Sequence, residues 1–461
     1  MKKFLLLFAL LTITLTTSGF SCKLNPFASS DNQQLLQPVT LEYWTVDQST
    51  DNLKELLSQW RSVHPNIIVN LKRFRAEEYE QKLLEGWAQN KGPDVYSLPN
   101  TWLRKYGKFI TPMPGSIQLA FQEITKTLGK EDVVTTIKKV TLLSPAQISR
   151  NYLQAVTDDV VWGNKVYGLP ISFDTLALFY NQKLLDAVGL PVPPATWTEV
   201  KEAVKKLTLL EAGNKIKQAG IALGTANNIP QAVNIAIALM IQNGVQMSAD
   251  NGSVTFNQTV KTGDQTISPA LDALNFYTDF ADPLKETYSW NKDLATATDL
   301  FLQGKLAMFL GLASELANLK NRAPKLDIKV APLPQIAGAS TPLNVGQYWV
   351  ETVSKQTKQP EAAWGLVWFL TQSPNVEKIL AKTGQAAALR SLIDQQKRSD
   401  QDVSVFAEQS LTAKTWYRGV QPEQMEKIFL ELITTLPQAA NQQQLINQTT
   451  ERLNQTLIEP K

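Results

Sequence analysis

Short apolar runs alternate with amphipathic stretches along most of this chain. Residues 39–44 (VTLEYW) alternate apolar and polar side chains, as a half-buried strand does. Apolar residues at helical spacing follow over 53–60, and a second strand pattern at 67–71 precedes a second helix pattern at 79–87. Repeated strand–helix alternation predicts βαβ units, a largely parallel sheet and an α/β fold.

The same alternation continues through the second half of the chain. Thr196 and Glu199 have the spacing of a capping box ahead of an amphipathic helix. A strand is predicted at 306–310, and a helix with tryptophans on one side at 361–370. The mostly apolar run 231–242 is too short to span a bilayer, so we expect it to form a buried helix.

Length and composition limit the class of protein. At 461 residues the chain exceeds what one ordinary core accommodates, so two lobes or domains are expected. Hydrophobic residues make up 43% and charged residues 19%, which is typical of a globular protein. The net charge is +3 and the basic residues are dispersed, so we expect no nucleic-acid partner.

The chain has one histidine, which limits its metal sites and catalytic groups. His64 alone cannot form a His-rich metal site, and any Ser-His-Asp triad would depend on it. It lies in residues 62–66 (SVHPN), a turn pattern between a helical run and a strand-like run. We therefore predict an exposed loop histidine, no metal site and no cofactor.

The N-terminal residues have the pattern of an export signal. Two lysines precede an apolar run at 4–15, which is shorter than a membrane-spanning helix. Residues 19–22 (GFSC) resemble a bacterial lipobox and end at Cys22, the chain's single cysteine. Gly19 stands where the usual lipobox has an aliphatic residue, so an ordinary cleaved signal peptide stays the alternative.

The lipoprotein interpretation places the protein outside the cytoplasm. Residues 1–22 would be a lipoprotein signal peptide ending at the lipidated Cys22, and the polar segment 23–39 would be a tether. Several acyl chains on Cys22 would anchor the protein stably to the cell membrane, on the periplasmic face in a Gram-negative-type cell.

Seven sequence blocks occur in the order and spacing of a known family. In chain order they are 92–96 (GPDVY), 168–170 (GLP), 178–181 (LFYN), 189–191 (GLP), 194–197 (PATW), 301–308 (FLQGKLAM) and 346–371. Together they resemble the extracellular solute-binding protein family 1, to which maltose- and maltodextrin-binding proteins belong. The resemblance covers nearly all of residues 40–390.

This resemblance implies a two-lobed clamp of the periplasmic-binding-protein type, with the ligand between the lobes. Each lobe would be a mainly parallel sheet flanked by helices, and several crossover segments would join them. Lobe one would comprise residues 40–171 and 332–372, and lobe two residues 173–330 and 385–461. By similarity, the chain would leave lobe one near 170–173, return near 331–334 and cross again between 371 and 385.

Ligands of open α/β sheets bind beyond the carboxyl ends of strands, so polar and aromatic residues there are candidate contacts. The Trp44 ring would stack on the apolar face of a pyranose, or else pack in the core. Asp174, at the first crossover, would bond ligand hydroxyls or cap a helix or strand. The candidate ligand-binding residues are Trp44, Thr45, Asp47, Gln48, Asn100, Asp174, Asn227, Asn228, Gly311, Ser314, Tyr348 and Trp349.

The chain departs from the maltodextrin-binding pattern where the family has stacking aromatics. Leu294 and Leu312 stand near two such positions. The residues that would supply stacking instead are Tyr348, Trp349, Trp416 and Tyr417, so the ligand need not be a maltodextrin even if it is a sugar.

We therefore predict a monomeric solute-binding protein of an ABC importer, which is not an enzyme. It would capture a sugar or oligosaccharide between two closing lobes and deliver it to a membrane permease. One alternative is a polyol or phosphorylated polyol as ligand, for which Arg390 is the candidate cation. The other is a periplasmic polysaccharide-acting enzyme with Asp47 and Asp174 as its carboxylate pair.

Overall fold

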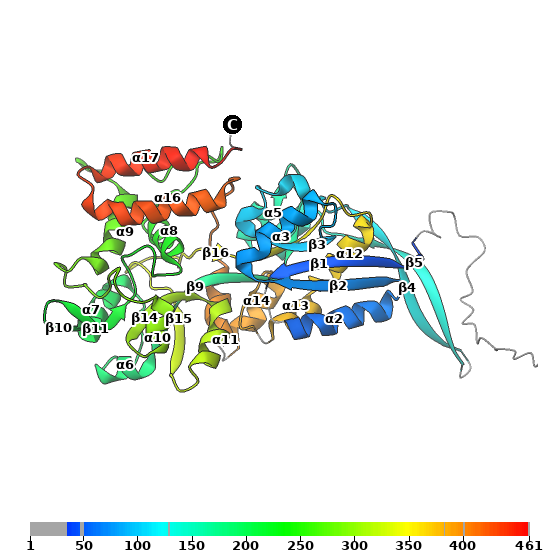
Figure 1. Cartoon of the computed structure of the whole chain (residues 1–461), viewed down its shortest axis with the longest axis horizontal. Coiled ribbons are helices and arrows are strands. Elements are labelled where there is room, and N and C mark those ends of the chain that lie inside the picture. Colours follow the sequence, from blue (N-terminus) through cyan, green and yellow to red (C-terminus); the bar gives the residue numbers. More distant parts are fainter. Residues whose placement is uncertain (1–34, 47–49, 128–129, 382, 400–401, 460–461) are drawn as a thin grey trace, which may run out of the picture.

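The computed structural model describes residues 35–46, 50–127, 130–381, 383–399 and 402–459. The predicted signal peptide, Cys22 and the tether up to residue 34 lie outside the described residues, as do Asp47 and Gln48. The described chain forms two lobes side by side, each built on its own sheet (Figure 1). The predicted two-lobed α/β architecture is confirmed.

Lobe one is built on a five-stranded sheet of order β2-β1-β3-β17-β8. Its strands are β1 (Val39–Val46), β2 (Ile67–Phe74), β3 (Val95–Pro99), β8 (Leu169–Pro170) and β17 (Trp349–Val353). The first three are parallel, as βαβ units require, and β17 runs antiparallel to β3 and β8. Helices α2 (Thr50–Val63), α3 (Ala76–Ala88), α4 (Pro145–Asn151), α5 (Gln154–Val160), α12 (Pro360–Leu370) and α13 (Ser373–Leu380) belong to this lobe, with η1 (Asn100–Trp102) and η2 (Gly107–Phe109).

Lobe two has a mixed sheet of order β10-β11-β14-β9-β15, with the short strands β16 and β18 also paired to β9. Its strands are β9 (Ser172–Asn181), β10 (Leu209–Glu211), β11 (Lys215–Ile221), β14 (Leu306–Leu312), β15 (Ile328–Pro332), β16 (Gly346–Gln347) and β18 (Ala386–Ala387). Only β11 and β14 are parallel neighbours along this described path, so a mainly parallel sheet was the wrong prediction here. Strand β9 continues from β8 of lobe one, and in this direction it runs antiparallel to both of its main neighbours, β14 and β15.

The lobe-two helices surround this sheet. They are α6 (Gln182–Ala187), α7 (Trp197–Leu207), α8 (Ala232–Gln242), α9 (Pro269–Thr278), α10 (Ala297–Leu302), α11 (Ala313–Arg322), α14 (Arg390–Lys397), α15 (Val403–Ser410), α16 (Pro422–Thr435) and α17 (Gln442–Gln455), with η3 (Asp279–Ala281) and η4 (Leu436–Gln438). The predicted buried helix is α8, which packs against α9 and α16. Within the described ranges, no helix is both long enough and apolar enough to cross a bilayer.

Three segments join the lobes. The first is β8, which pairs in lobe one and leads directly into β9 of lobe two. The second runs from β16, which pairs with β9, into β17, which pairs with β3. The third runs from α13, which packs on α2, to β18, which pairs with the start of β9.

The second crossing lies later than the predicted return at residues 331–334. Strand β15 stays paired with β9 up to Pro332. The segment that follows remains on lobe two, where the Leu333 amide donates to Gln409 and the Gln335 amide to Ala195. The two prolines at 332 and 334 therefore end an edge strand, and the chain returns to lobe one only between Gly346 and Trp349.

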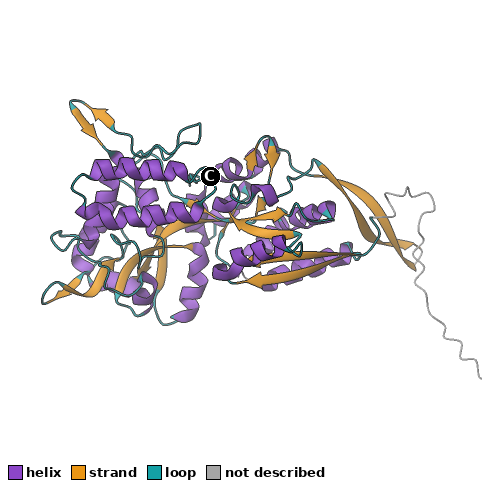
Figure 2. Ribbon diagram, turned by 45° about the horizontal axis from the view of Figure 1, so that its top comes forward, coloured by secondary structure: helices purple, strands orange, loops and turns teal. Residues whose placement is uncertain are grey.

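A long hairpin of β4 (Ser116–Thr127) and β5 (Lys130–Thr141) projects from lobe one (Figures 1 and 2). His64 lies at its base, where its Nδ1–H donates to the Ala120 carbonyl at 2.7 Å. The ring packs 4.0 Å from the ring of Trp60 and 4.5 Å from that of Phe121, measured between centroids, and burial lowers its pKa. The predicted exposed histidine is thus wrong, because the hairpin covers a position that is locally a turn. Other hairpins among the described residues are β6 (Val161–Trp162) with β7 (Lys165–Val166), β10 with β11, and β12 (Val260–Thr262) with β13 (Gln265–Ile267).

Candidate functional site

A cavity of about 250 Å³ lies between lobe one and the C-terminal part of lobe two. Lobe one contributes η1, and lobe two contributes α8, the N-terminus of α16 and the segment before it. The lining residues are Asn100, Thr101, Trp102, Val233, Asn234, Ile237, Val345, Gly346, Gln347, Lys414, Thr415, Trp416, Tyr417, Pro422, Glu423, Met425 and Glu426. Four distant stretches of sequence therefore meet at one concave site.

Amide side chains and tryptophan rings give the cavity its chemistry. Asn100, Asn234 and Gln347 supply groups that both donate and accept hydrogen bonds. The Asn234 amide donates to Gln347 at 3.3 Å, so the two already form one polar surface. Trp102 and Trp416 are half-buried, leaving part of each ring accessible for stacking.

The charged residues of the cavity carry both signs. Glu423, at the start of α16, pairs with Lys105 of lobe one at 2.7 Å, and Lys105 also pairs with Glu80. Burial raises the pKa of the Glu426 carboxyl, and the neighbouring Glu423 raises it further. Lys414 lines the same cavity and is exposed. Two carboxylates beside one lysine do not favour a phosphate group in the cavity.

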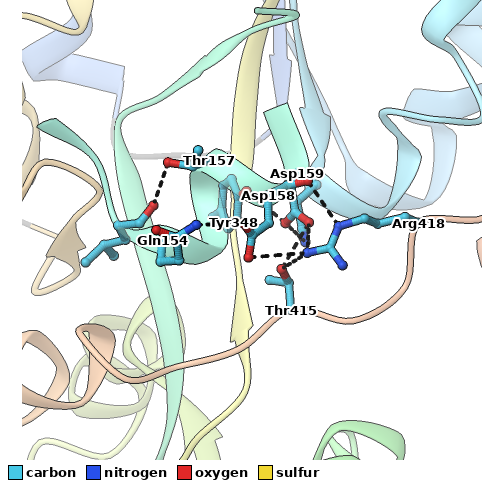
Figure 3. Close-up of polar contacts among 9 residues, drawn as sticks. Gln154, Thr157, Asp158, Asp159, Tyr348, Thr415 and Arg418 are labelled. Atoms are coloured by element: carbon cyan, nitrogen blue, oxygen red, sulfur yellow. Dashed lines mark hydrogen bonds and ion pairs between the residues drawn. The ribbon is translucent and has the colours of Figure 1, made fainter. Parts of the chain in front are cut away.

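A buried carboxylate lies behind the cavity. Asp159, on α5, is 3% exposed and accepts hydrogen bonds from Asn100 Nδ2 at 3.1 Å, Tyr348 Oη at 2.9 Å and Thr415 Oγ1 at 3.0 Å. Arg418 Nη2 lies 3.1 Å from the same carboxylate (Figure 3). Burial raises the pKa of Asp159, while Arg418 and the three hydrogen bonds act in the opposite direction.

The predicted contacts after β1 lie in the core of lobe one. Trp44 is buried, its ring centroid 5.0 Å from that of Phe74 and its six-membered ring close against Gly86. Thr45 is also buried, and its Oγ1 lies 3.0 Å from Ser97 Oγ. Both residues pack within the lobe, as the alternative interpretation of Trp44 had it, and neither lines the cavity.

Asp174 caps a helix rather than facing open solvent. Its oxygens accept from the amides of Ala313 at 2.8 Å and Ser314 at 3.0 Å, the first residues of α11. The carboxylate is buried, which raises its pKa, and these hydrogen bonds act to lower it. Of the two interpretations of Asp174, these contacts are those of a helix cap, with α11 beginning against the carboxylate.

The remaining lobe-two candidates have structural partners or lie away from the cavity. Asn228 donates to the carbonyls of Asn291 and Leu294 and accepts from Trp290 Nε1, so its amide is fully used. Gly311 is buried in β14, where an added Cβ would lie 2.6 Å from Glu315. The exposed candidates are Asn227 and Ser314, and neither lines the cavity.

The structure brings Asn100 to the cavity, with Tyr348 directly behind it. The Tyr348 hydroxyl is bound to Asp159 and its ring stacks on Phe173, 5.1 Å between centroids, so it supports the site without a free face. Trp349 is half-buried, with its ring edge toward Tyr79. Arg390, the candidate phosphate-binding cation, donates to the Tyr152 carbonyl away from this cavity.

Sequence reasoning missed Asn234, Gln347, Thr415 and Asp159. Asn234 carried a signal, because a polar residue interrupting an otherwise apolar helix often has a specific role. Thr415 and Asp159 carried none, since each is an ordinary polar residue until the other is packed against it. Among the described residues, no group of three His, Cys, Asp or Glu side chains could hold a metal ion.

Comparison with known proteins gives a family for the chain. The sequence profile of bacterial extracellular solute-binding proteins matches residues 47–377. The maltodextrin-binding protein of Bacillus subtilis (strain 168) is 27% identical over 259 residues, or 53% of this chain and 55% of that protein. An uncharacterized lipoprotein of Streptomyces antibioticus is 24% identical over 180 residues, or 37% of this chain and 34% of that protein. The chain thus spans about half, or less, of the length of these relatives.

Solved structures share the fold. The cyclic α-maltosyl-1,6-maltose binding protein of Arthrobacter globiformis matches with a TM-score of 0.70, over 91% of this chain and 99% of that chain. Sequence identity in this match is 17%, so it establishes the two-lobed fold and not the ligand.

Proposed function

This chain belongs to the family of bacterial extracellular solute-binding proteins, and from that premise we propose that it captures a sugar or oligosaccharide for an ABC importer. The relatives named above as maltodextrin- and cyclic maltosyl-maltose-binding proteins support a carbohydrate ligand. Delivery to a membrane permease is part of the same proposal, because capture between lobes is useful only if a partner receives the solute.

The observation that carries the proposal is the interlobe cavity lined by amides and tryptophans. Hydroxyl-rich ligands need partners that donate and accept, and the three cavity amides provide both. Pyranose rings also have an apolar face, which Trp102 and Trp416 can cover. A volume of 250 Å³ equals that of about eight liquid waters at ~30 Å³ each, so it suits a small sugar or one end of an oligosaccharide.

We propose Asn100, Asn234, Gln347, Trp102 and Trp416 as the ligand contacts. They come from both lobes, so a ligand touching all five would favour the closed form. Asp47 and Gln48 stay predicted contacts outside the described residues. A phosphorylated polyol is the less favoured ligand, because the acidic side chains of α16 lie beside the single lysine among the described lining residues.

A thermal-shift screen of the purified chain tests the proposal. Maltose, maltotriose, monosaccharides, polyols and phosphorylated polyols would be compared, since a ligand at a hundred times its Kd adds about 2.7 kcal/mol of stability. Trp416→Ala should weaken binding of any hit by about 1 kcal/mol or more through lost stacking. Trp368→Ala is the matched control, because this half-buried tryptophan of α12 does not line the cavity. A screen in which only non-carbohydrate solutes shift the melting temperature would refute the sugar proposal.

We further propose that the protein binds its solute without converting it. The family and the solved structures that it resembles are binding proteins. Any hit should be recovered unchanged, by mass spectrometry, after long incubation with the protein. A cleaved product that scales with protein concentration would instead support the polysaccharide-acting enzyme.

We also propose that a lipidated Cys22 anchors the protein to the membrane and that the protein is a monomer. The lipobox-like residues 19–22 support lipidation, as does the relative described as a lipoprotein. A two-lobed clamp can enclose its ligand within one chain, which supports a monomer. Gel filtration with light scattering tests the oligomeric state.

A further inference from the structure

One buried carboxylate joins three segments of the chain that come from both lobes. Asp159 of α5 accepts a hydrogen bond from Asn100, which follows β3. It also binds Tyr348 of the second crossing. From the segment before α16, it binds Thr415 and Arg418 (Figure 3). That last segment belongs to lobe two, because α16 packs on α8 and α17 packs on α9. Asp159 is therefore a point at which lobe two docks on lobe one.

We propose that Asp159 is the positioning residue of the interlobe cavity, and that Arg418 docking on it couples assembly of the binding site to lobe closure. This proposal deepens the proposed function and rests on it for the identity of the ligand, but the effect of Asp159 on closure can be measured in the ligand-free chain.

The positioning role follows from which groups Asp159 holds. Asn100 and Thr415 line the cavity from opposite lobes, and each donates one hydrogen bond to the same carboxylate. Because Asn100 donates through Nδ2, its Oδ1 points away from Asp159 and stays available as an acceptor. An ionised carboxylate has about four lone-pair sites, and its four partners here use that capacity. Asp159 is thus fully occupied and acts on a ligand only through its neighbours.

The coupling role follows from burial. Three other described ion pairs cross the same joint: Arg418 with Asp158 at 4.0 Å, Lys105 with Glu423 at 2.7 Å, and Lys108 with Glu459 at 3.2 Å. The side chains of Lys108 and Glu459 are 63% and 71% exposed, so solvent screens their attraction. The Asp159 side chain is 2% exposed, so its charge loses its compensation when Arg418 leaves. Among the described ion pairs across this joint, Asp159 with Arg418 has the most buried carboxylate, so we expect its loss to affect closure most.

A second arginine, Arg104, lies in the electrostatic surroundings of Asp159 and Arg418. The Arg104 guanidinium lies 4.1 Å from the centre of the Trp162 ring, and its pKa is lowered by burial and by Arg418 but raised by Asp159.

The test measures lobe closure directly in the ligand-free chain. Cys22→Ser removes the single native cysteine, and Leu84→Cys on α3 with Val192→Cys on lobe two then provide exposed sites for a pair of spin labels. Double electron–electron resonance gives the populations of short and long interlobe distances. We expect Asp159→Asn and Arg418→Gln each to lower the closed-to-open ratio at least tenfold. The double variant should be no worse than either single one, because both remove the same interaction.

Matched variants separate coupling from a loss of stability. Asp158→Asn is the control: its carboxylate is about half exposed and lies 4.0 Å from Arg418, so the distances should not change. Arg418→Lys keeps the charge and should restore part of the closed population. Melting temperatures of all variants show whether each one folds. If Asp159→Asn does not fold, the Arg418 variants still test the proposal.

The outcomes are distinct. Unchanged distances in folded Arg418→Gln, or fully additive effects in the double variant, would overturn the proposal. A wild-type chain that binds no sugar would refute the proposed function, while the distance measurement would still decide the role of Asp159.

Discussion

Glu351 gives lobe one a pH dependence that can be measured. This residue of β17 is 3% exposed, and its carboxylate accepts from Tyr43 Oη at 2.9 Å and Ser97 Oγ at 2.8 Å. Burial raises its pKa to about 7, while the hydrogen bonds from Ser97 and Tyr43 act to lower it. No ion pair reaches this carboxylate from the described residues.

The sign of the effect follows from proton linkage. The folded pKa of about 7 lies above the model-peptide value of 4.5, so the native state holds its proton more tightly than the unfolded chain. The contribution of Glu351 to stability is fully present below pH 4.5 and is lost as the pH rises through 7. The difference of 2.5 pKa units at 1.36 kcal/mol each corresponds to about 3 kcal/mol.

Glu351→Gln should remove this dependence. The amide cannot ionise, so the variant should match the wild type near pH 4.5 and exceed its stability at pH 8 by up to about 3 kcal/mol. Urea unfolding midpoints from pH 4.5 to 9, at constant ionic strength, provide the measurement. Glu315→Gln is the necessary comparison, because burial raises the pKa of Glu315 to about 7 as well. The assignment of the pH dependence to Glu351 would be refuted if the urea midpoint of Glu351→Gln varied with pH as in the wild type, while Glu315→Gln removed that variation.

Three further outcomes are expected. Asp174→Ala leaves the first amides of α11 uncapped and should cost about 1–2 kcal/mol, seen as a lower urea midpoint; an unchanged midpoint would exclude the capping role. His64→Ala removes the hydrogen bond at the base of the β4–β5 hairpin and should cost about 1–3 kcal/mol. Proteolysis within the hairpin should quicken accordingly, whereas an unaltered cleavage pattern would show that the hairpin is held by other contacts. Cys22→Ser should leave the melting temperature unchanged and release the protein from membranes, so its retention after high-salt washing would contradict lipidation.

One residue of the cavity was within reach of reasoning from strand ends. Asn100 was singled out because it follows a predicted strand, and the structure places it on the cavity wall. The same reasoning named Trp44 and Thr45, which point into lobe one instead. Strand alternation tells which residues share a face, but not which face the helices cover. Tertiary packing decides whether such a residue is buried, and here Gly86 of α3 covers the Trp44 ring.

The local sequence pattern was sufficient to predict the structural features that depend on residues close together in the chain. The alternation of strands and helices predicted the α/β class, and the capping box of Thr196 and Glu199 is present, with the Glu199 amide donating to Thr196 at 3.2 Å. The apolar run before residue 242 is the buried helix α8. These features arise from interactions within a few residues, so spacing and side-chain type determine them.

Tertiary structure alone decided the features that join distant residues. His64 lies in a local turn and is buried only because the β4–β5 hairpin folds over it. Asp174 is a cap only because α11, 139 positions later, begins against it. Asp159 and Arg418 meet across the joint between the lobes, where burial makes one charge depend on the other. The sequence by itself determined the elements and the family likeness, whereas the cavity exists only where four distant segments pack together, and no local pattern records that contact.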